Sequence, residues 1–428
     1  MFSFFSDLNS NKVDFEHVDY SMLTQLEDAE EGYALEFKSC FDTSVKNKLP
    51  SIIASFANVE GGLIVIGIEN KSHRITPILK EDIDWSQRIG VLATEYISPT
   101  PAITVRFLED PDSPNQGVLL VMVLEGNEPP YVSKGTVYIR SGSSTEPKKA
   151  ESNDIIALLR KREAFIARQD EFFRRSVFLP LDGRASAPSC AVFSVFLFNA
   201  RGFATIRPLA EIKELISSVI DSNCGSGALG YYATSTSDSV LVQSKGNNGV
   251  NTFSSTVEFF GNGGIKASIP LALVTDEAEK YSVLRYLVGV KDESTVLQLR
   301  PIGFESLKRV MDIAVLISDY TKCVGAEPRD YLVKFEREAL QGTVLYTNAP
   351  EYLEVAAENG LPFCAIADGM TRTRKLAPLH EHDVIISEIF CEFLRSYCLF
   401  DDFCERKGFF KPLVNLFGAT LGISNIDE

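Results

Sequence analysis

The sequence lacks a long apolar stretch and a leader at its start. No run reaches the about 18 apolar residues that suggest a membrane-spanning helix, and the most apolar segment, near 311–317, is short enough for a buried helix. The first residues, Met-Phe-Ser-Phe-Phe-Ser-Asp, contain neither a basic region nor a cleavage site, so no signal peptide is expected. These absences predict a cytoplasmic protein that makes no contact with a membrane.

Several catalytic and metal-binding motifs are also missing. None of the 8 cysteines forms a C-x-x-C pair, which argues against a zinc ribbon or a redox motif. Gly261-Asn-Gly-Gly-Ile-Lys266 lacks the spacing of a phosphate-binding P-loop and lies between two predicted strands, so a hairpin turn is expected there. His380-Glu-His382 lacks the H-E-x-x-H spacing of a zinc site. No sequence feature supports an ATPase or a dehydrogenase.

Positive charge is scarce. The 428 residues carry a net charge of −16, whereas proteins that coat duplex nucleic acid are usually basic because they neutralise phosphates. Any contact with nucleic acid must therefore come from a local basic patch, or from acidic residues that hold cations against the phosphates. With 45% hydrophobic residues, a chain of this length is expected to form two or three globular domains.

Local patterns predict an N-terminal domain of mixed α/β (α+β) class. Residues 33–38 alternate as a half-buried strand does, after a short helix that Ser21 would cap. Leu49, Ile52, Ile53 and Phe56 share one helical face, with Pro50 in the first turn and the end near Asn58. Residues 63–68 are continuously apolar, as in a strand buried on both faces. Further strands are predicted at 103–108, 117–124 and 136–140, and a helix at 153–168.

The remainder of the chain is predicted to form one or two further α+β domains. Residues 178–270 contain strand patterns and one helix, and residues 276–428 appear more helical. The predicted domains are 1–168, 176–275 (strand-rich) and 276–428 (helix-rich). The expected strands are 191–198, 230–234, 240–243, 252–260 and 266–271, and the expected helices 208–220, 276–288, 304–321, 329–341 and 380–405.

Glu31, Glu36 and Lys38 are the first candidates for chemistry. Two carboxylates at one end of a strand can hold a divalent cation, which orients water and neutralises charge at phosphorus. Lys38 lies on the same side of the strand as Glu36 and could contact a phosphate. From spacing alone, a solvent-exposed strand face with paired charges is the commoner explanation of these three residues, because alternating charges on strands are frequent.

Three sequence blocks resemble the Schlafen-type AlbA_2 domain across residues 27–165. The first is Glu31-Gly-Tyr-Ala-Leu-Glu-Phe-Lys38. The second contains Ala54-Ser-Phe-Ala-Asn58, Gly61-Gly62 and Ile66-Gly67. The third contains Pro129, Tyr131, Tyr138-Ile-Arg140 and Gly142-Ser-Ser-Thr145. Glycines and Asn58 in the second block are also explained by close packing of a helix on a strand.

The resemblance implies nucleic-acid handling, since some Schlafen members are metal-dependent endoribonucleases that act on tRNA and rRNA. The first two of the family's three acidic residues correspond to Glu31 and Glu36. The third, an Asp, corresponds to Asn70, which supplies no negative charge. On this resemblance, Glu31 and Glu36 would hold Mg²⁺ or Mn²⁺, with Asn70 or Glu69 completing the ligand shell and Lys38 assisting.

A basic segment follows the third block. Arg140, Ser143 and Ser144 could hold phosphate or form an ordinary turn, and Lys148, Lys149, Arg160 and Lys161 could follow a nucleic-acid backbone or form a solvated helix face. The leading hypothesis is an endoribonuclease on structured RNA such as tRNA, with RNA favoured over DNA. A non-catalytic DNA- or RNA-binding regulator and an acidic protein–protein scaffold are the alternatives. Since Schlafen-type nucleases place two related lobes around RNA, a homodimer is a further hypothesis.

Overall fold

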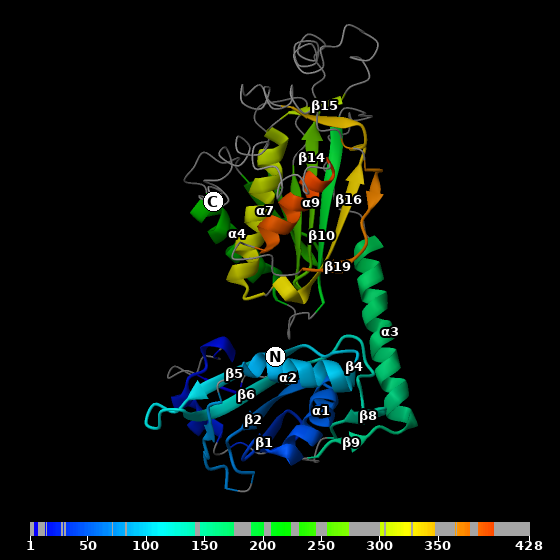
Figure 1. Cartoon of the computed structure of the whole chain (residues 1–428). Helices are drawn as coiled ribbons and strands as arrows, with labels where there is room; N and C mark the ends of the chain where they lie inside the picture. Colours follow the sequence, from blue (N-terminus) through cyan, green and yellow to red (C-terminus); the bar gives the residue numbers. More distant parts are fainter. Residues whose placement is uncertain are drawn as a thin grey trace, which may run out of the picture. The chain divides into compact units, whose positions relative to one another are not determined.

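The chain divides into two compact units, Met1–Asp170 (unit 1) and Glu171–Glu428 (unit 2) (Figure 1). In the described part of the chain, no helix is both long and apolar enough to cross a membrane. The computed structural model describes residues 4–6, 13, 15–26, 29, 31–70, 72–81, 84–141, 146–174, 190–200, 207–223, 231–244, 255–273, 300–303, 305–326, 328–346, 364, 366–376 and 384–397.

Unit 1 is built on a mixed five-stranded sheet, which confirms the predicted α+β class. β1 and β2 are parallel, and β6 pairs antiparallel with β2, β3 and β5. The strands are β1 (Leu35–Lys38), β2 (Gly61–Ile66), β3 (Ile78–Leu79), β5 (Ile103–Glu109) and β6 (Gln116–Leu124). A smaller sheet joins β4 (Ile97–Ser98), β7 (Val132–Ser133), β8 (Thr136–Ile139) and β9 (Lys148–Lys149).

Helices and short helical turns cover both faces of the larger sheet. One face packs on α1 and α2, and the other packs on the N-terminal segment. Because β2 is covered on both sides, all its residues are buried, as the apolar run predicted. The helices of unit 1 are α1 (Thr43–Asn58), α2 (Trp85–Tyr96) and α3 (Ser152–Arg174), which continues into unit 2, and the 3₁₀ turns are η1 (Phe15–His17) and η2 (Tyr20–Leu26).

Two helix starts differ from the prediction. Ser21 lies within the 3₁₀ turn η2 and does not cap an α-helix. Helix α1 begins earlier than expected, because Asp42 caps it by accepting a hydrogen bond from the Val45 N–H at 2.8 Å. Pro50 therefore lies inside α1, and its missing N–H breaks one backbone hydrogen bond of the helix.

Unit 2 contains an eight-stranded sheet with strand order β11-β12-β13-β14-β10-β16-β18 and β19 beside β16. α4, α7 and α9 pack on one of its faces and form the core of the unit (Figure 1). The main strands are β10 (Cys190–Asn199), β11 (Tyr231–Ser235), β12 (Ser239–Ser244), β13 (Thr256–Phe260), β14 (Ile265–Ala272) and β16 (Tyr331–Glu338). The remaining elements are α4 (Leu209–Asn223), α7 (Glu305–Cys323), α9 (Val384–Arg395), η4 (Pro328–Asp330), β18 (Gly369–Met370), β19 (Arg374–Lys375), and the parallel pair β15 (Arg300–Gly303) and β17 (Thr343–Tyr346).

The predicted helix at 329–341 is wrong, because this segment forms strand β16. Its residues alternate between buried and partly exposed, and Tyr331, Val333 and Phe335 face the core. That is the period of two that a strand with one core face shows. β10 pairs with β14 on one edge and with β16 on the other, so the division predicted near residue 275 passes through one sheet. The predicted helix at 276–288 lies outside the described residues.

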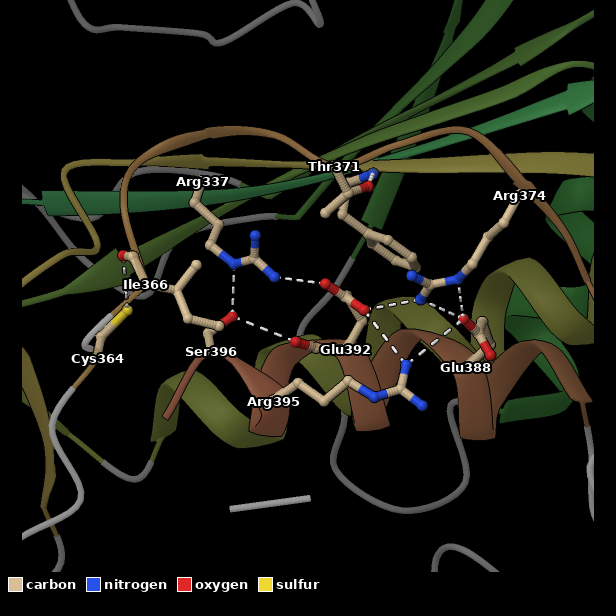
Figure 2. Close-up of polar contacts among 10 residues, drawn as sticks. Arg337, Cys364, Ile366, Thr371, Arg374, Glu388, Glu392, Arg395 and Ser396 are labelled. Carbon is tan, nitrogen blue, oxygen red and sulfur yellow. Dashed lines mark hydrogen bonds and ion pairs between the residues drawn. The ribbon is translucent and has the colours of Figure 1, made fainter. Parts of the chain in front are cut away.

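A buried ionic cluster joins α9 to β16 and β19 (Figure 2). Glu392 accepts hydrogen bonds from Arg337, from Arg374 at 2.7 Å and from Arg395 at 3.3 Å. Glu388 accepts two hydrogen bonds from Arg374, and Arg337 also donates to Ser396 at 2.7 Å. Glu388, Glu392 and Arg337 are each at most 6% exposed, so these charges are removed from water and depend on one another.

Candidate functional site

Glu36 lies at the centre of the predicted site and is almost completely buried. It points away from Leu35 and Phe37, which face the opposite core of unit 1, and it is 3% exposed. One carboxylate oxygen accepts a hydrogen bond from Arg140 and the other from Lys38. The structure therefore brings the first and third sequence blocks together through a buried ion pair, where an exposed charged strand face had been the alternative.

Arg140 also connects the third block to helix α1. Its Nε donates to the Ser55 Oγ at 3.2 Å, and its Cζ lies 4.4 Å from the centre of the Phe56 ring. These contacts fix the guanidinium plane before any ligand is present. From its sequence position, Arg140 was expected to bind phosphate or to form part of an ordinary turn, and neither its partner Glu36 nor its neighbour Ser55 was predicted. Only the joint match of the three blocks to one family linked these positions.

Glu31 and Asn70 meet beside this ion pair. One Glu31 oxygen accepts a hydrogen bond from the Phe37 N–H at 2.6 Å, and the other accepts from the Asn70 amide at 3.3 Å. Burial raises the pKa of Glu31, and the negative charge of Glu36 raises it further, while the Phe37 N–H and the charges of Lys38 and Arg140 oppose the shift. The negative charge of Glu31 is therefore unfavourable in the folded protein.

Glu69, the other candidate ligand, points into its own turn. Its carboxylate accepts a hydrogen bond from the Ser72 hydroxyl at 2.5 Å, and its carbonyl accepts from the His73 N–H at 2.9 Å. Its side chain thus bonds to a neighbour three residues away.

The residues present do not fit a Mg²⁺ or Mn²⁺ site in this arrangement. Both Glu36 oxygens are bound to cationic side chains, which oppose a further positive charge beside them. The third family position is the neutral Asn70. In the described part of the chain, no group of three or more His, Cys, Asp and Glu residues is placed to hold a metal ion. Glu36 therefore belongs to a polar cluster in which Lys38 and Arg140 already neutralise its charge.

Replacing Glu31 with glutamine is expected to stabilise unit 1 at neutral pH. A carboxyl whose pKa is raised by folding contributes stability below its unfolded pKa, near 4.5, and loses that contribution as the pH rises through the folded value. The E31Q variant should therefore show a higher urea midpoint than the wild type at pH 7 and a smaller difference at pH 4. Trp85, the only tryptophan of the chain, lies in unit 1 and reports this transition by fluorescence. An equal difference at both pH values would contradict the prediction.

The second block has a structural role. Asn58, which is 2% exposed, donates hydrogen bonds to the carbonyls of Tyr131 and Tyr138 at 2.9 and 2.8 Å and accepts one from the Tyr131 N–H at 2.7 Å. It thereby fixes the β7–β8 hairpin on the end of α1. A Cβ at Gly62 would lie 2.5 Å from the Phe56 ring, so only glycine allows this close approach.

The predicted phosphate-binding residues differ in accessibility. Lys148 and Lys149 form β9 and are exposed, and Lys148 pairs with Glu151 at 3.0 Å. Lys161 instead pairs with Glu125 at 2.7 Å and donates to the Val59 carbonyl at 2.8 Å, so it anchors α3 to unit 1. Arg160, Arg162 and Arg168 are exposed on α3. Ser143, Ser144 and His380-Glu-His382 lie outside the described residues, and the Gly261–Gly264 segment forms the predicted hairpin turn between β13 and β14.

A comparison with known families covers most of unit 1. Residues 31–149 match the family described as Schlafen, AlbA_2, which confirms the resemblance that the three blocks indicated. The match leaves residues 150–428 outside it, and it points to a nucleic-acid-related function for unit 1. Among solved structures, the DIP2311 protein from Corynebacterium diphtheriae is 18% identical with a TM-score of 0.24; the alignment covers 48% of this chain and 33% of that one. That similarity is too low for any feature to be transferred.

Proposed function

We propose that unit 1 is a metal-independent nucleic-acid-binding domain and that the chain acts as a non-catalytic regulator. The observation that carries this proposal is the state of Glu36, whose carboxylate is neutralised by Arg140 and Lys38. A carboxylate that is already paired with two cations has little capacity to recruit a divalent ion. Asn70 supports the same reading, since it binds Glu31 and adds no negative charge.

The binding surface would be formed by the exposed cations that follow the third block. Lys148 and Lys149 on β9 and Arg160, Arg162 and Arg168 on α3 all reach solvent. Their contacts would be with phosphates, because lysine and arginine side chains neutralise the backbone and carry no direct sequence information. A local patch of this kind is compatible with a net charge of −16 for the whole chain.

Binding of labelled tRNA and duplex DNA to the full chain, measured by anisotropy over a range of salt concentrations, tests the proposal. We expect binding that persists in EDTA, favours RNA and weakens steeply with salt. Lys148→Glu/Lys149→Glu should weaken binding and lower the salt slope by about 2. Lys213→Glu/Lys322→Glu, a matched charge reversal on exposed lysines of unit 2, should leave the tRNA affinity unchanged. Absence of any binding at low salt would favour the acidic scaffold instead.

A metal-dependent endoribonuclease is the second candidate, favoured by the meeting of Glu31, Glu36 and Asn70 in one place. It predicts that tRNA is cleaved in Mn²⁺ or Mg²⁺ and that E31Q abolishes cleavage. Cleavage of that kind would overturn the non-catalytic proposal, and intact tRNA after incubation with Mn²⁺ would support it. E31Q keeps the fold by the argument given above, so loss of cleavage would not reflect unfolding.

A further inference from the structure

The sheet of unit 2 has a second face that its core does not use. Along β10, Phe193, Val195 and Leu197 point into the core, so the alternate residues Ser194, Phe196 and Phe198 point the other way. The register extends this second face across the neighbouring strands. A sheet with one face on a core commonly has its other face in water, but here many of the residues on the other face are buried.

One row of this face is polar across five strands. The register aligns Thr256 with Ser268, and Ser268 with Ser194. The Thr256 and Ser268 hydroxyls are fully buried, and neither has a hydrogen-bond partner among the residues that the structure describes. A buried hydroxyl without a partner is unfavourable, and such a group in a folded protein needs an explanation. The complete row is Gln243, Thr256, Ser268, Ser194 and Glu336.

The adjacent part of the face is aromatic and carries lysine. Phe196, Phe198 and Phe260 lie on it, and the Lys266 ammonium is 5.8 Å from the Phe196 ring and 5.6 Å from the Phe260 ring. Lys266 is cross-strand neighbour to Phe196 on one side and to Glu258 on the other. The phenylalanine rings provide flat surfaces on which another ring can stack, and Lys266 places a positive charge beside them.

Two phenylalanines from the last turn of α3 occupy this aromatic surface within unit 2. The Phe172 ring lies 5.4 Å from Phe198 and 5.6 Å from Phe260, centre to centre. The Phe173 ring lies 6.1 Å from Phe198. Both are buried, and Lys266 lies 4.5 Å from the Phe172 ring. Both rings therefore cover the aromatic surface, tilted or edge-on to its phenylalanines, and Phe172 also contacts its lysine.

We propose that this face is a binding surface for single-stranded nucleic acid, and that Phe172 and Phe173 hold the positions of two stacked bases until the strand displaces them. Bases stack on aromatic side chains of a sheet surface, and their edges hydrogen-bond to nearby polar groups. The unpartnered Thr256 and Ser268 hydroxyls are where such base edges would bond. This goes beyond the proposed function, which concerns unit 1 and structured nucleic acid.

Charge on this face predicts how the strand is held. Lys266 and Lys334 share this surface with Glu258, Glu336 and Glu338, so its described side chains carry no net positive charge. Affinity should then come from stacking and hydrogen bonds, and its dependence on salt should be shallower than that of unit 1.

Anisotropy with a fluorescein-labelled 12-nucleotide oligouridylate, bound to the full chain, tests this. Phe172→Ala/Phe173→Ala should tighten binding about tenfold or more, since removal of the two rings leaves the aromatic surface open for bases to stack on it. T256V/S268A should weaken binding severalfold while leaving the urea midpoint of unit 2 unchanged or raised, because neither hydroxyl bonds to a described residue of the protein. A purely structural role predicts no change in binding for either variant.

Different variants test the nucleic-acid-binding proposal for unit 1 and the sheet-face proposal for unit 2. Lys148→Glu/Lys149→Glu should reduce tRNA binding and leave oligouridylate binding intact, whereas T256V/S268A should do the reverse. Should neither the wild type nor Phe172→Ala/Phe173→Ala bind oligouridylate, the sheet-face proposal is wrong. If the double alanine variant does not fold, T256V/S268A decides the question alone: unchanged affinity overturns the proposal.

Discussion

Replacing Arg140 with leucine is expected to lower the free energy of unfolding of unit 1 by about 3–5 kcal/mol, because it leaves Glu36 buried and half paired. The Arg140 side chain is 0% exposed and that of Glu36 is 4% exposed, so water cannot replace the lost partner. The hydrogen bond to Ser55 and the contact with Phe56 are lost as well. Urea unfolding followed by Trp85 fluorescence measures the change.

An exposed ion pair in the same unit provides the control. Lys80 and Glu109 form a salt bridge whose side chains are 45% and 58% exposed. Lys80→Leu should change stability by less than about 1 kcal/mol, as surface pairs do. Glu36→Leu/Arg140→Leu, which removes both charges, should recover most of the loss. A loss in Arg140→Leu no larger than that in Lys80→Leu would show that the pair is not buried in solution.

Glu392→Gln is expected to destabilise unit 2 by about 3–5 kcal/mol. Three arginines converge on this one carboxylate, and Figure 2 shows that they come from β16, β19 and α9. Glutamine keeps the size but removes the charge, so Arg337, itself 6% exposed, faces a neutral amide. α9 should then detach more readily from the sheet. Circular dichroism should show the unit 2 transition at lower urea while Trp85 fluorescence is unchanged.

Glu211→Gln is the matched substitution on a helix surface. Glu211 pairs with Arg207 at 2.5 Å, with side chains 47% and 30% exposed. Such a pair contributes about 0.3–0.5 kcal/mol. Equal effects of Glu392→Gln and Glu211→Gln would contradict a stabilising role for the buried cluster.

Local sequence patterns correctly predicted the elements that are buried evenly along one face or on both faces. The apolar run at 63–68 became the buried strand β2, and the helical face of Leu49 and Phe56 became α1. The helix predicted at 329–341 was wrong. Tyr331, Val333 and Phe335 do recur with the period of two that is typical of a strand, but the pattern is short and also contains residues common in helices. Its identity as a strand depends on pairing with β10, more than a hundred residues away.

The sequence placed three of the candidate residues near one another but did not indicate how the charges pair. Glu31, Glu36 and Asn70 were expected to gather, and Asn70 does bond to Glu31. Glu36 and Arg140 are 104 residues apart, so no local period connects them. Lys161 was expected to follow a nucleic-acid backbone or to lie on a solvated helix face, whereas its contacts with Glu125 and Val59 give it an anchoring role that the sequence did not indicate. Pairing of charges is a property of the folded chain.

The buried polar residues of unit 1 and their partners are synthesised at different times. Glu36 and Asn58 are made early during synthesis, and their partners Tyr131, Tyr138 and Arg140 follow 73 to 104 residues later. Until Arg140 has left the ribosome, closing the sheet would bury the Glu36 carboxylate without its arginine partner, which is unfavourable. The nascent domain should therefore stay open until that residue arrives and then close in one cooperative step.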